Sequence, residues 1–473
     1  MLTGKRQESS ATVRRGRPGD VSAVAWVPDR RELGRQRFGW YAYGWASHSF
    51  ETTVVSVFMS RYLPTVAENA VGQNGRLHVL GLPILPGSLF VYLISACNVL
   101  LAVLMPVVGA FADRTGRKRL MLLGFGYLGA VSCTAMIFVG RTDWILGAAL
   151  FAAAFLNYSC AKVVYNSMLP DLAEPDLRDR VSSVGWAAGY VGSGILLATN
   201  FAGSFFIDDK ALLARVSLCS AGLWWALFSL IPLAILRHLP RPVTGCRQPP
   251  GWAIFSGFRE LADTLRGLRR FPLTLLFLVA FLIYYDGIST VTTISADYGQ
   301  KELHLDETTL LSAILLVQFT GFGGILLLGR CAERWGAKKV IAASLLVWIG
   351  VVVAVYFLQA GNAPQFYTVA LVLSIVLGGT QALSRSLYSS MIPRGKEAEY
   401  FSLYEISSSG TSALGPLLFG LTLQNTGSYR TANLSLIVFF VVGLLVLLTI
   451  NVPKAIRATG NTPPTSVGKP TST

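Results

Sequence analysis

Residues 109–119 read GAFADRTGRKR and residues 329–339 read GRCAERWGAKK, so glycine, acidic and basic positions recur 220 residues apart. A second pair of stretches, KVVYNSMLP at 162–170 and RSLYSSMIP at 385–393, matches at an offset of 223 residues. Self-similarity at nearly half the chain length is the signature of an internal duplication. The sequence therefore predicts two halves built on one plan.

Long apolar runs separated by short charged stretches make up most of the remaining sequence. Of the 473 residues, 52% are apolar and only 14% are charged, against about a quarter charged in a soluble domain. Twelve runs are each long enough to cross about 30 Å of hydrocarbon as a helix. They lie at 38–60, 88–112, 119–140, 144–168, 184–206, 213–236, 273–296, 308–331, 338–358, 366–391, 402–423 and 431–451. The pattern predicts an all-α membrane protein with twelve transmembrane helices in two six-helix halves.

The net charge of +15 is explained by where the basic residues lie. In a soluble protein this balance would suggest nucleic-acid binding, but no basic patch here is interleaved with aromatic residues. If the loops alternate between the two sides of the membrane, 31 of the 40 Lys and Arg residues fall on the side that carries both termini. Cytoplasmic loops are enriched in Lys and Arg, so both termini are predicted to be cytoplasmic and no nucleic-acid partner is expected.

The predicted spans divide the chain into five parts. These are a basic cytoplasmic tail at 1–37, an N-terminal half at 38–236, a cytoplasmic loop at 237–272, a C-terminal half at 273–452 and a disordered cytoplasmic tail at 453–473. Apolar residues recur at helical spacing in the loop, which favours an interfacial helix over a solvated linker. No C-x-x-C pair, phosphate-binding loop or hydrolase motif is present. We therefore expect no metal, no cofactor and no enzyme activity.

The loop stretches at 109–119 and 329–339 have a readable chemistry. Their glycines allow close helix approach, and their acidic residues can face the N-terminus of a neighbouring helix. The residues expected to form a gate are Gly109, Asp113, Arg117, Gly329, Glu333 and Arg334. The alternative, a topology signal of basic residues, explains neither the acids nor the glycines. Two six-span halves with this loop resemble the major facilitator superfamily.

A narrower resemblance rests on the stretch GGTQALSRS at 378–386, followed by Pro393, EYF at 399–401 and LGP at 414–416. This succession resembles the vacuolar amino-acid effluxer family involved in autophagy and its bacterial relatives. The resemblance implies an amino-acid exporter in the inner membrane of a bacterium. One position departs from the family, whose members usually carry Tyr-Asp-Trp in the first span, because this chain has Gly44 in place of the acid.

Ionisable residues deep within predicted spans are candidates for function. Glu51 and Asp286 each lie 13 residues into their spans, about 20 Å deep at 1.5 Å per residue. The duplication predicts that both carboxylates face one cavity, where desolvation favours uptake of a proton. His48 lies one turn before Glu51 and could share that proton. The alternatives are a structural ion pair for Glu51 and simple packing for His48.

Lys162 and Arg385 occupy equivalent positions in the two halves and could hold a carboxylate, either of a solute or of Glu51 or Asp286. The alternative is that each side chain reaches toward its own helix end. Polar and aromatic side chains that could line the same cavity, or serve only in helix packing, are Asn166, Gln318, Gln381, Tyr43 and Tyr285.

These residues favour a secondary active transporter that works by alternating access and exports amino acids or similar small polar solutes. Its expected partners are the solute and membrane lipids, with protons as a candidate coupling ion, and we expect a monomer. The alternatives are an exporter of amphipathic drugs or lipids, and a membrane scaffold or receptor without transport activity. A scaffold has little reason to keep charges inside its spans.

Overall fold

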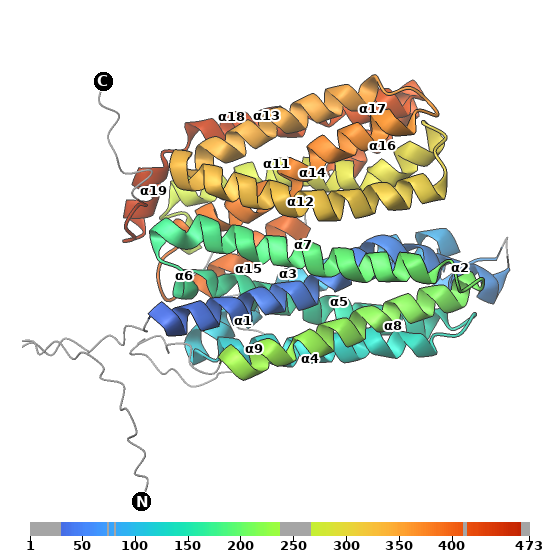
Figure 1. The fold of residues 1–473 in the computed structure, drawn as a ribbon, viewed down its shortest axis with the longest axis horizontal. Coiled ribbons are helices and arrows are strands. Elements are labelled where there is room, and N and C mark those ends of the chain that lie inside the picture. Colours follow the sequence, from blue (N-terminus) through green and yellow to red (C-terminus); the bar gives the residue numbers. More distant parts are fainter. Residues whose placement is uncertain (1–29, 73–74, 80–81, 237–265, 410–413, 465–473) are drawn as a thin grey trace, which may run out of the picture.

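A computed structural model of the chain describes residues 30–72, 75–79, 82–236, 266–409 and 414–464. The described part consists almost entirely of long helices that lie side by side (Figure 1). Most of the tail at 1–37 lies outside the described residues. So does most of the loop at 237–272, with most of the expected interfacial helix; the last residues of that helix, 266–268, are described and helical.

The first half forms one side of the molecule (Figure 1). Its long helices are α1 (Arg30–Ser49), the π-helix η1 (Phe50–Phe58), α2 (Met59–Val71), α3 (Leu89–Thr115), α4 (Lys118–Thr134), α5 (Trp144–Ser167), α7 (Arg178–Gly203) and α8 (Lys210–Phe228). Its short elements are β1 (Leu77–Val79), β2 (Leu82–Ile84), η2 (Pro86–Ser88), η3 (Ala135–Phe138), α6 (Leu169–Leu172), η4 (Pro175–Leu177) and α9 (Leu230–Ile235). The strands β1 and β2 pair antiparallel, with Leu77 opposite Ile84.

The second half repeats this plan. Its helices are α11 (Pro272–Lys301), α12 (Glu307–Trp335), α13 (Ala337–Tyr356), α14 (Ala363–Ser390), α15 (Glu397–Ser409), α16 (Leu414–Thr426), α17 (Tyr429–Ser435), α18 (Ile437–Thr449) and α19 (Val452–Ala458). Helices α7, α12 and α14 pack together, as do α3, α5 and α15, so the two halves share a long interface. The end of the molecule that carries residues 109–119 and 329–339 is called the signature end below.

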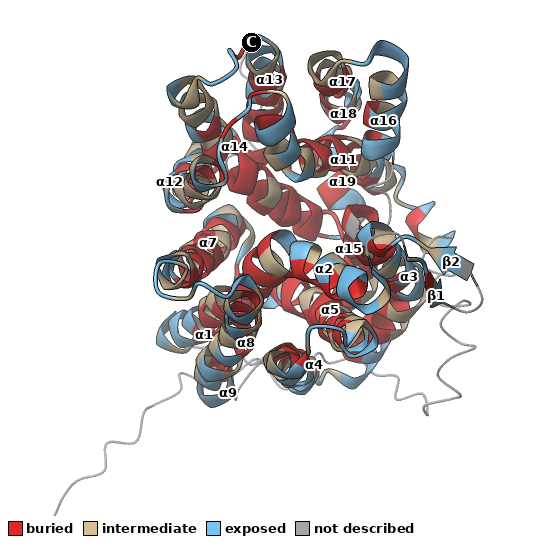
Figure 2. Cartoon of the chain, turned by 90° about the vertical axis from the view of Figure 1, so that its right-hand side faces the viewer, coloured by how far each residue is buried: buried red, intermediate tan, exposed pale blue. Residues whose placement is uncertain are grey.

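Among the described residues, ten helices are long and apolar enough to cross a membrane. The segments α1–η1–α2 and α15–α16 correspond to the two other predicted spans, at 38–60 and 402–423. Buried residues gather where helices face one another, and exposed residues lie on the outward faces (Figure 2). Many of the exposed residues are large and apolar. Exposed apolar surface of this extent is expected of helices that face lipid. The predicted all-α membrane architecture in two halves is confirmed.

Two features differ from the sequence-based expectation. The first span begins at Arg30, eight residues before the predicted start, and changes to a π-helix around Glu51. The tail predicted to be disordered from residue 453 begins instead with α19, in which Ala455 and Ile456 are buried. Asn461 then donates hydrogen bonds to the carbonyls of Ser390 and Ile392, so the prediction of disorder is wrong as far as residue 464.

Small residues allow close packing within the N-terminal half. A Cβ atom at Gly129 of α4 would lie 2.5 Å from the ring of Trp225 on α8, and this tryptophan is fully buried. Gly124 on the same helix is exposed and has nothing within 4 Å of such an atom. The two glycines lie on the same helix and therefore differ in how closely other side chains pack against them.

We predict that Gly129→Ala destabilises the protein by about 1–3 kcal/mol, because the new methyl group overpacks the α4–α8 contact. The control Gly124→Ala should leave stability unchanged or raise it by up to about 1 kcal/mol through helix propensity. Thermal unfolding of the two variants in detergent checks this. Equal melting temperatures would contradict the packing argument.

Candidate solute site at the interface of the halves

Asp113, at the end of α3, joins the two halves at the signature end. Its Oδ1 accepts a hydrogen bond from the N–H of Ala398 (3.1 Å), and its Oδ2 accepts one from the N–H of Glu399 (2.9 Å). These N–H groups belong to the first turn of α15, where the helix leaves donors free and carries partial positive charge. The contact expected between the first acid and a helix N-terminus is therefore present. Its role as a gate stays a prediction.

Glycine and lysine complete this contact. A Cβ atom at Gly109 would collide with the carbonyl group of Ala398, so only glycine lets α3 approach α15 this closely. The buried Nζ of Lys118 lies 3.0 Å from Asp171 Oδ2, 3.6 Å from Glu397 Oε2 and 3.9 Å from Asp113 Oδ1. The sequence analysis singled out Arg117, which is exposed, whereas Lys118 is the basic residue that bridges the halves.

The second copy of the loop stretch does not repeat the contact of the first. A Cβ atom at Gly329 would lie 2.6 Å from Ser183 Oγ, so close helix approach is kept. Glu333 and Arg334, however, are exposed, and neither makes a hydrogen bond or ion pair within the described part of the chain. Asp179 of α7 accepts instead a hydrogen bond from Ser386 Oγ of α14 (2.6 Å). The two predicted gate acids are thus not equivalent.

Two arginines strengthen the interface between α7 and α14. Arg178 Nη1 donates to the carbonyl of Ser389 (3.1 Å). Arg385 donates from Nε to Ser182 Oγ (3.0 Å) and from Nη2 to the carbonyl of Ser182 (2.8 Å). All these groups are buried, so the halves are in polar contact along this line.

A small pocket with a cavity volume of about 30 Å³ lies between α1, α5, α7 and α14. A solute larger than water therefore needs the halves to move apart before it can bind there. Five predicted candidates line it, namely Tyr43, His48, Lys162, Asn166 and Arg385. The remaining lining residues are Gly44, Ser47, Tyr158, Tyr165, Gly185 and Trp186. The duplication therefore brings its two equivalent basic residues to a single site.

Arg385 carries a buried positive charge at this pocket. Its guanidinium carbon lies 5.0 Å from the ring centre of Trp40, and 5.6 Å from the rings of both Tyr165 and Trp186. Aromatic faces attract cations at these distances. Its Nη1 also donates to Asn166 Oδ1 (3.0 Å), which links α14 to α5. The guanidinium is thereby fixed beside the pocket.

Lys162 pairs with a carboxylate that the sequence analysis did not single out. Its Nζ lies 3.5 Å from Glu405 Oε2 of α15, and Glu405 Oε1 accepts a hydrogen bond from Asn166 Nδ2 (2.5 Å). Glu405 is 1% exposed. It lies near the start of the span predicted at 402–423, where an acid is expected to face the membrane surface. The sequence signal that could have identified Glu405 was the presence of an acidic residue within a predicted span.

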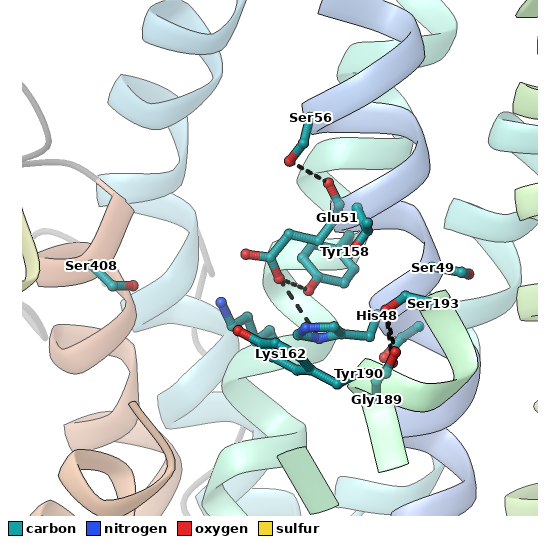
Figure 3. A network of polar contacts seen from close by, with 12 residues as sticks. His48, Ser49, Glu51, Ser56, Tyr158, Lys162, Gly189, Tyr190, Ser193 and Ser408 are labelled. Atoms are coloured by element: carbon teal, nitrogen blue, oxygen red, sulfur yellow. Dashed lines mark hydrogen bonds and ion pairs between the residues drawn. The ribbon is translucent and has the colours of Figure 1, made fainter. Parts of the chain in front are cut away.

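Glu51 lies within the π-helix, near Lys162, and is not among the residues that line the pocket (Figure 3). Tyr158 Oη donates to Glu51 Oε2 (2.6 Å), and His48 Nδ1 lies 4.0 Å from the same oxygen (Figure 3). The side chain of Lys162 points toward this group (Figure 3). The Glu51 side chain is 36% exposed. π-Helical turns are frequent at functional sites.

A family model described as "Vacuole effluxer Atg22 like" matches residues 34–460. The chain belongs to this family. It is similar to an uncharacterized MFS-type transporter of Bacillus subtilis, YxiO, with 29% identity over 88% of this chain and 95% of that protein. It is also similar to autophagy-related protein 22 of Kluyveromyces lactis, with 27% identity over 92% of this chain and 96% of the relative.

Solved structures of other transporters share the fold. A bacterial homologue of the iron transporter ferroportin in its outward-facing state aligns with a TM-score of 0.61 and 16% identity, covering 88% of this chain and 98% of that one. The proton:xylose symporter XylE aligns with a TM-score of 0.62 and 12% identity, covering 88% and 94%. This Atg22-like protein is therefore a multi-pass integral membrane transporter of the major facilitator superfamily, with small molecules as its substrates.

Asp286 is almost fully buried and faces no cavity within the described part of the chain, so the expectation that it shares one cavity with Glu51 is wrong. Asp286 is 1% exposed, and its Oδ2 accepts a hydrogen bond from the N–H of Gly415 (2.8 Å) at the start of α16. A helix that begins inside a span has free N–H groups, and a buried carboxylate satisfies them. Asp286 is a helix cap within its own half.

The other polar candidates are not among the residues that line the pocket. Gln318 donates from Nε2 to Thr52 Oγ1 across the halves (3.0 Å), which is the helix-packing alternative. Gln381 is partly buried and makes no hydrogen bond within the described residues. Tyr285 is partly buried and packs on Phe281, with ring centres 5.1 Å apart.

Gly44, the departure from the family pattern, lines the pocket. A Cβ atom there would lie 2.8 Å from Tyr165 Oη and 3.0 Å from the carbonyl of Gly185. Helix α1 thus packs so closely on α5 and α7 that a side chain at this position would require Tyr165 and the backbone at Gly185 to shift. The missing acid is consistent with this packing.

We predict that Asp113→Asn opens the signature end and that Glu333→Gln does not. Losing the Asp113 charge at the start of α15 should shift the equilibrium between the closed and the open signature end toward the open form by about 1–3 kcal/mol. Glu333 is exposed, so its substitution should not shift this equilibrium. The measurement is the labelling rate of a cysteine introduced by Ser389→Cys at the buried α7–α14 contact. We expect the labelling rate to rise for Asp113→Asn alone. Equal labelling rates in both variants would refute the assignment of Asp113 as the gate residue.

Proposed function

We propose that this Atg22-like protein is a secondary active transporter that exports amino acids or similar small polar solutes by alternating access. The observation that carries the proposal is the pocket between the halves, with Lys162 and Arg385 beside it and Glu51 and Glu405 within reach of Lys162. Ionisable groups inside a membrane protein are costly, and they mark solute pathways. The family description as an effluxer supports the direction of transport.

The pocket offers complementary chemistry for an amino acid. Cations can hold a carboxylate, and carboxylates can hold an ammonium group. Tyr43, Tyr158, Tyr165 and Trp186 supply an aromatic wall for an apolar side chain. Oη of Tyr43 and Tyr165 and Nε1 of Trp186 are buried without a hydrogen-bond partner within the described residues. Buried polar groups normally have a partner, and a polar solute can supply it once the halves move apart.

Alternating access requires the seal at the signature end to break. The contacts that must part are those of Asp113 with α15, and those of Arg178 and Arg385 across the α7–α14 line. Each joins a side chain of one half to backbone or side-chain groups of the other half. We place both termini and this end in the cytoplasm of a bacterial cell, in line with the excess of basic residues on that side.

Glu51 is the candidate proton site. It is the carboxylate within the first predicted span, its side chain is 36% exposed, and Tyr158 and His48 lie beside it. A carboxylate that releases and binds a proton while the cavity changes sides can couple transport to a proton gradient.

The proposed function is tested with the purified protein in two ways. Thermal stabilisation across the twenty amino acids and a panel of amphipathic drugs identifies the solute class, because a ligand that binds the folded state raises the melting temperature. Counterflow exchange in proteoliposomes then shows whether the stabilising solute is transported. Stabilisation and exchange by drugs alone would favour an amphipathic-drug exporter, and neither effect with any solute would refute transport of these compounds.

We predict that Glu51→Gln abolishes accumulation driven by a pH gradient while counterflow exchange persists, because the variant cannot carry a proton. The control Asp286→Asn should lower thermal stability by about 1–3 kcal/mol, through loss of a charged helix cap, and should keep gradient-driven accumulation. Gradient-driven accumulation by Glu51→Gln at the wild-type level would rule out this residue as the coupling site.

A further inference from the structure

Lys162 and Glu405 form an ion pair between the halves, at the edge of the pocket. Lys162 belongs to α5 and Glu405 to α15, and their Nζ and Oε2 atoms lie 3.5 Å apart. The Glu405 side chain is 2% exposed and that of Lys162 is 21% exposed. Lys162 lines the pocket and is therefore the member that a solute reaches first.

Further hydrogen bonds extend the pair into a chain across the molecule. Asn166 Nδ2 donates to Glu405 Oε1 (2.5 Å), and Ser408 Oγ lies 3.3 Å from Glu405 Oε2. Asn166 Oδ1 accepts in turn from Arg385 Nη1 (3.0 Å). The polar chain thus runs from α14 through α5 to α15.

Rearrangement of the halves separates α5 from α15, and this separation has an electrostatic cost. Breaking a buried ion pair leaves two charges without partners, which is strongly unfavourable. Glu51 lies near Lys162 in the same half (Figure 3), but its carboxylate contacts Tyr158 and His48, and it forms no ion pair with Lys162 within the described residues. Glu405 has no ion-pair partner other than Lys162 in the same part of the chain. Separation of the pair therefore leaves Lys162 without an anion and Glu405 without a cation.

A solute can supply both missing partners only if it carries both charges. A simple carboxylate would satisfy Lys162 and leave Glu405 unpaired, whereas a simple amine would do the reverse. An α-amino acid carries an ammonium and a carboxylate on one carbon atom, so it adds no net charge. It can replace one short ion pair by two.

We propose that the Lys162–Glu405 pair is the recognition element for a zwitterionic solute, which inserts between the two side chains with its carboxylate on Lys162 and its ammonium on Glu405. This inference rests on the proposed function and adds the site and the charge requirement. The inserted solute contacts both halves and relieves the cost of separating them. Glu405 is then a specificity-determining residue.

The test compares three forms of one solute on the full-length protein. The amino acid that stabilises the wild type most in the thermal assay is tested beside its amide, which lacks the carboxylate, and its deaminated acid, which lacks the ammonium. Both analogues should bind at least about tenfold more weakly than the parent, because each leaves one buried charge unpaired. Binding of either analogue within about threefold of the parent would overturn the proposal.

Two variants should change the charge requirement in opposite directions. Glu405→Gln removes the need for an ammonium, so the deaminated acid should approach the affinity of the amino acid. Lys162→Gln removes the need for a carboxylate, so the affinity of the amide should instead approach that of the amino acid. The control is Glu302→Gln, which breaks the 2.7 Å ion pair with Arg430 inside the C-terminal half and should leave the preference for the zwitterion unchanged.

The outcomes separate this inference from the proposed function. Exchange of amino acids and both analogues with similar affinities would leave the transport function standing and refute insertion into the ion pair. The absence of binding and exchange with every amino acid would refute both. If either variant fails to fold, the wild-type comparison of the three solute forms still decides the question.

Discussion

The contact of the Asp113 carboxylate with the first turn of α15 fixes the arrangement of the two halves at the signature end. The N–H groups of Ala398 and Glu399 lack partners within their own helix, and Asp113 satisfies both from the other half. Glu405 lies six residues further along α15, about 9 Å at 1.5 Å per residue. The carboxylate that pairs with Lys162 is therefore carried on the helix that Asp113 holds, so the seal and the pocket are mechanically connected.

The duplication has produced two halves with similar backbones and different chemistry. Lys162 and Arg385 are equivalent in sequence, yet the first makes an ion pair with Glu405 and the second lies among aromatic rings. Likewise, Asp113 is buried at a helix start, whereas Glu333 is exposed. Equivalence by internal repeat thus predicts where a residue lies along its span. The neighbours from other helices decide what it does.

The fold could be predicted from the sequence because hydrocarbon imposes helices of known length on apolar runs. The repeat also located Lys162 and Arg385, which the structure brings to one pocket. The pairing of Glu405 could not be predicted, because it depends on the register between α5 and α15. The prediction for Asp286 was wrong because the sequence shows its charge but does not show that α16 starts next to it, inside a span.

The absence of a side chain at position 44 bears on the shape of the pocket. A Cβ atom there would lie 2.8 Å from Tyr165 Oη and 3.0 Å from the carbonyl of Gly185, so a side chain fits only if these groups shift. Tyr165 and Gly185 also line the pocket. Any residue larger than glycine at position 44 would therefore reshape the pocket wall as well as the packing of α1.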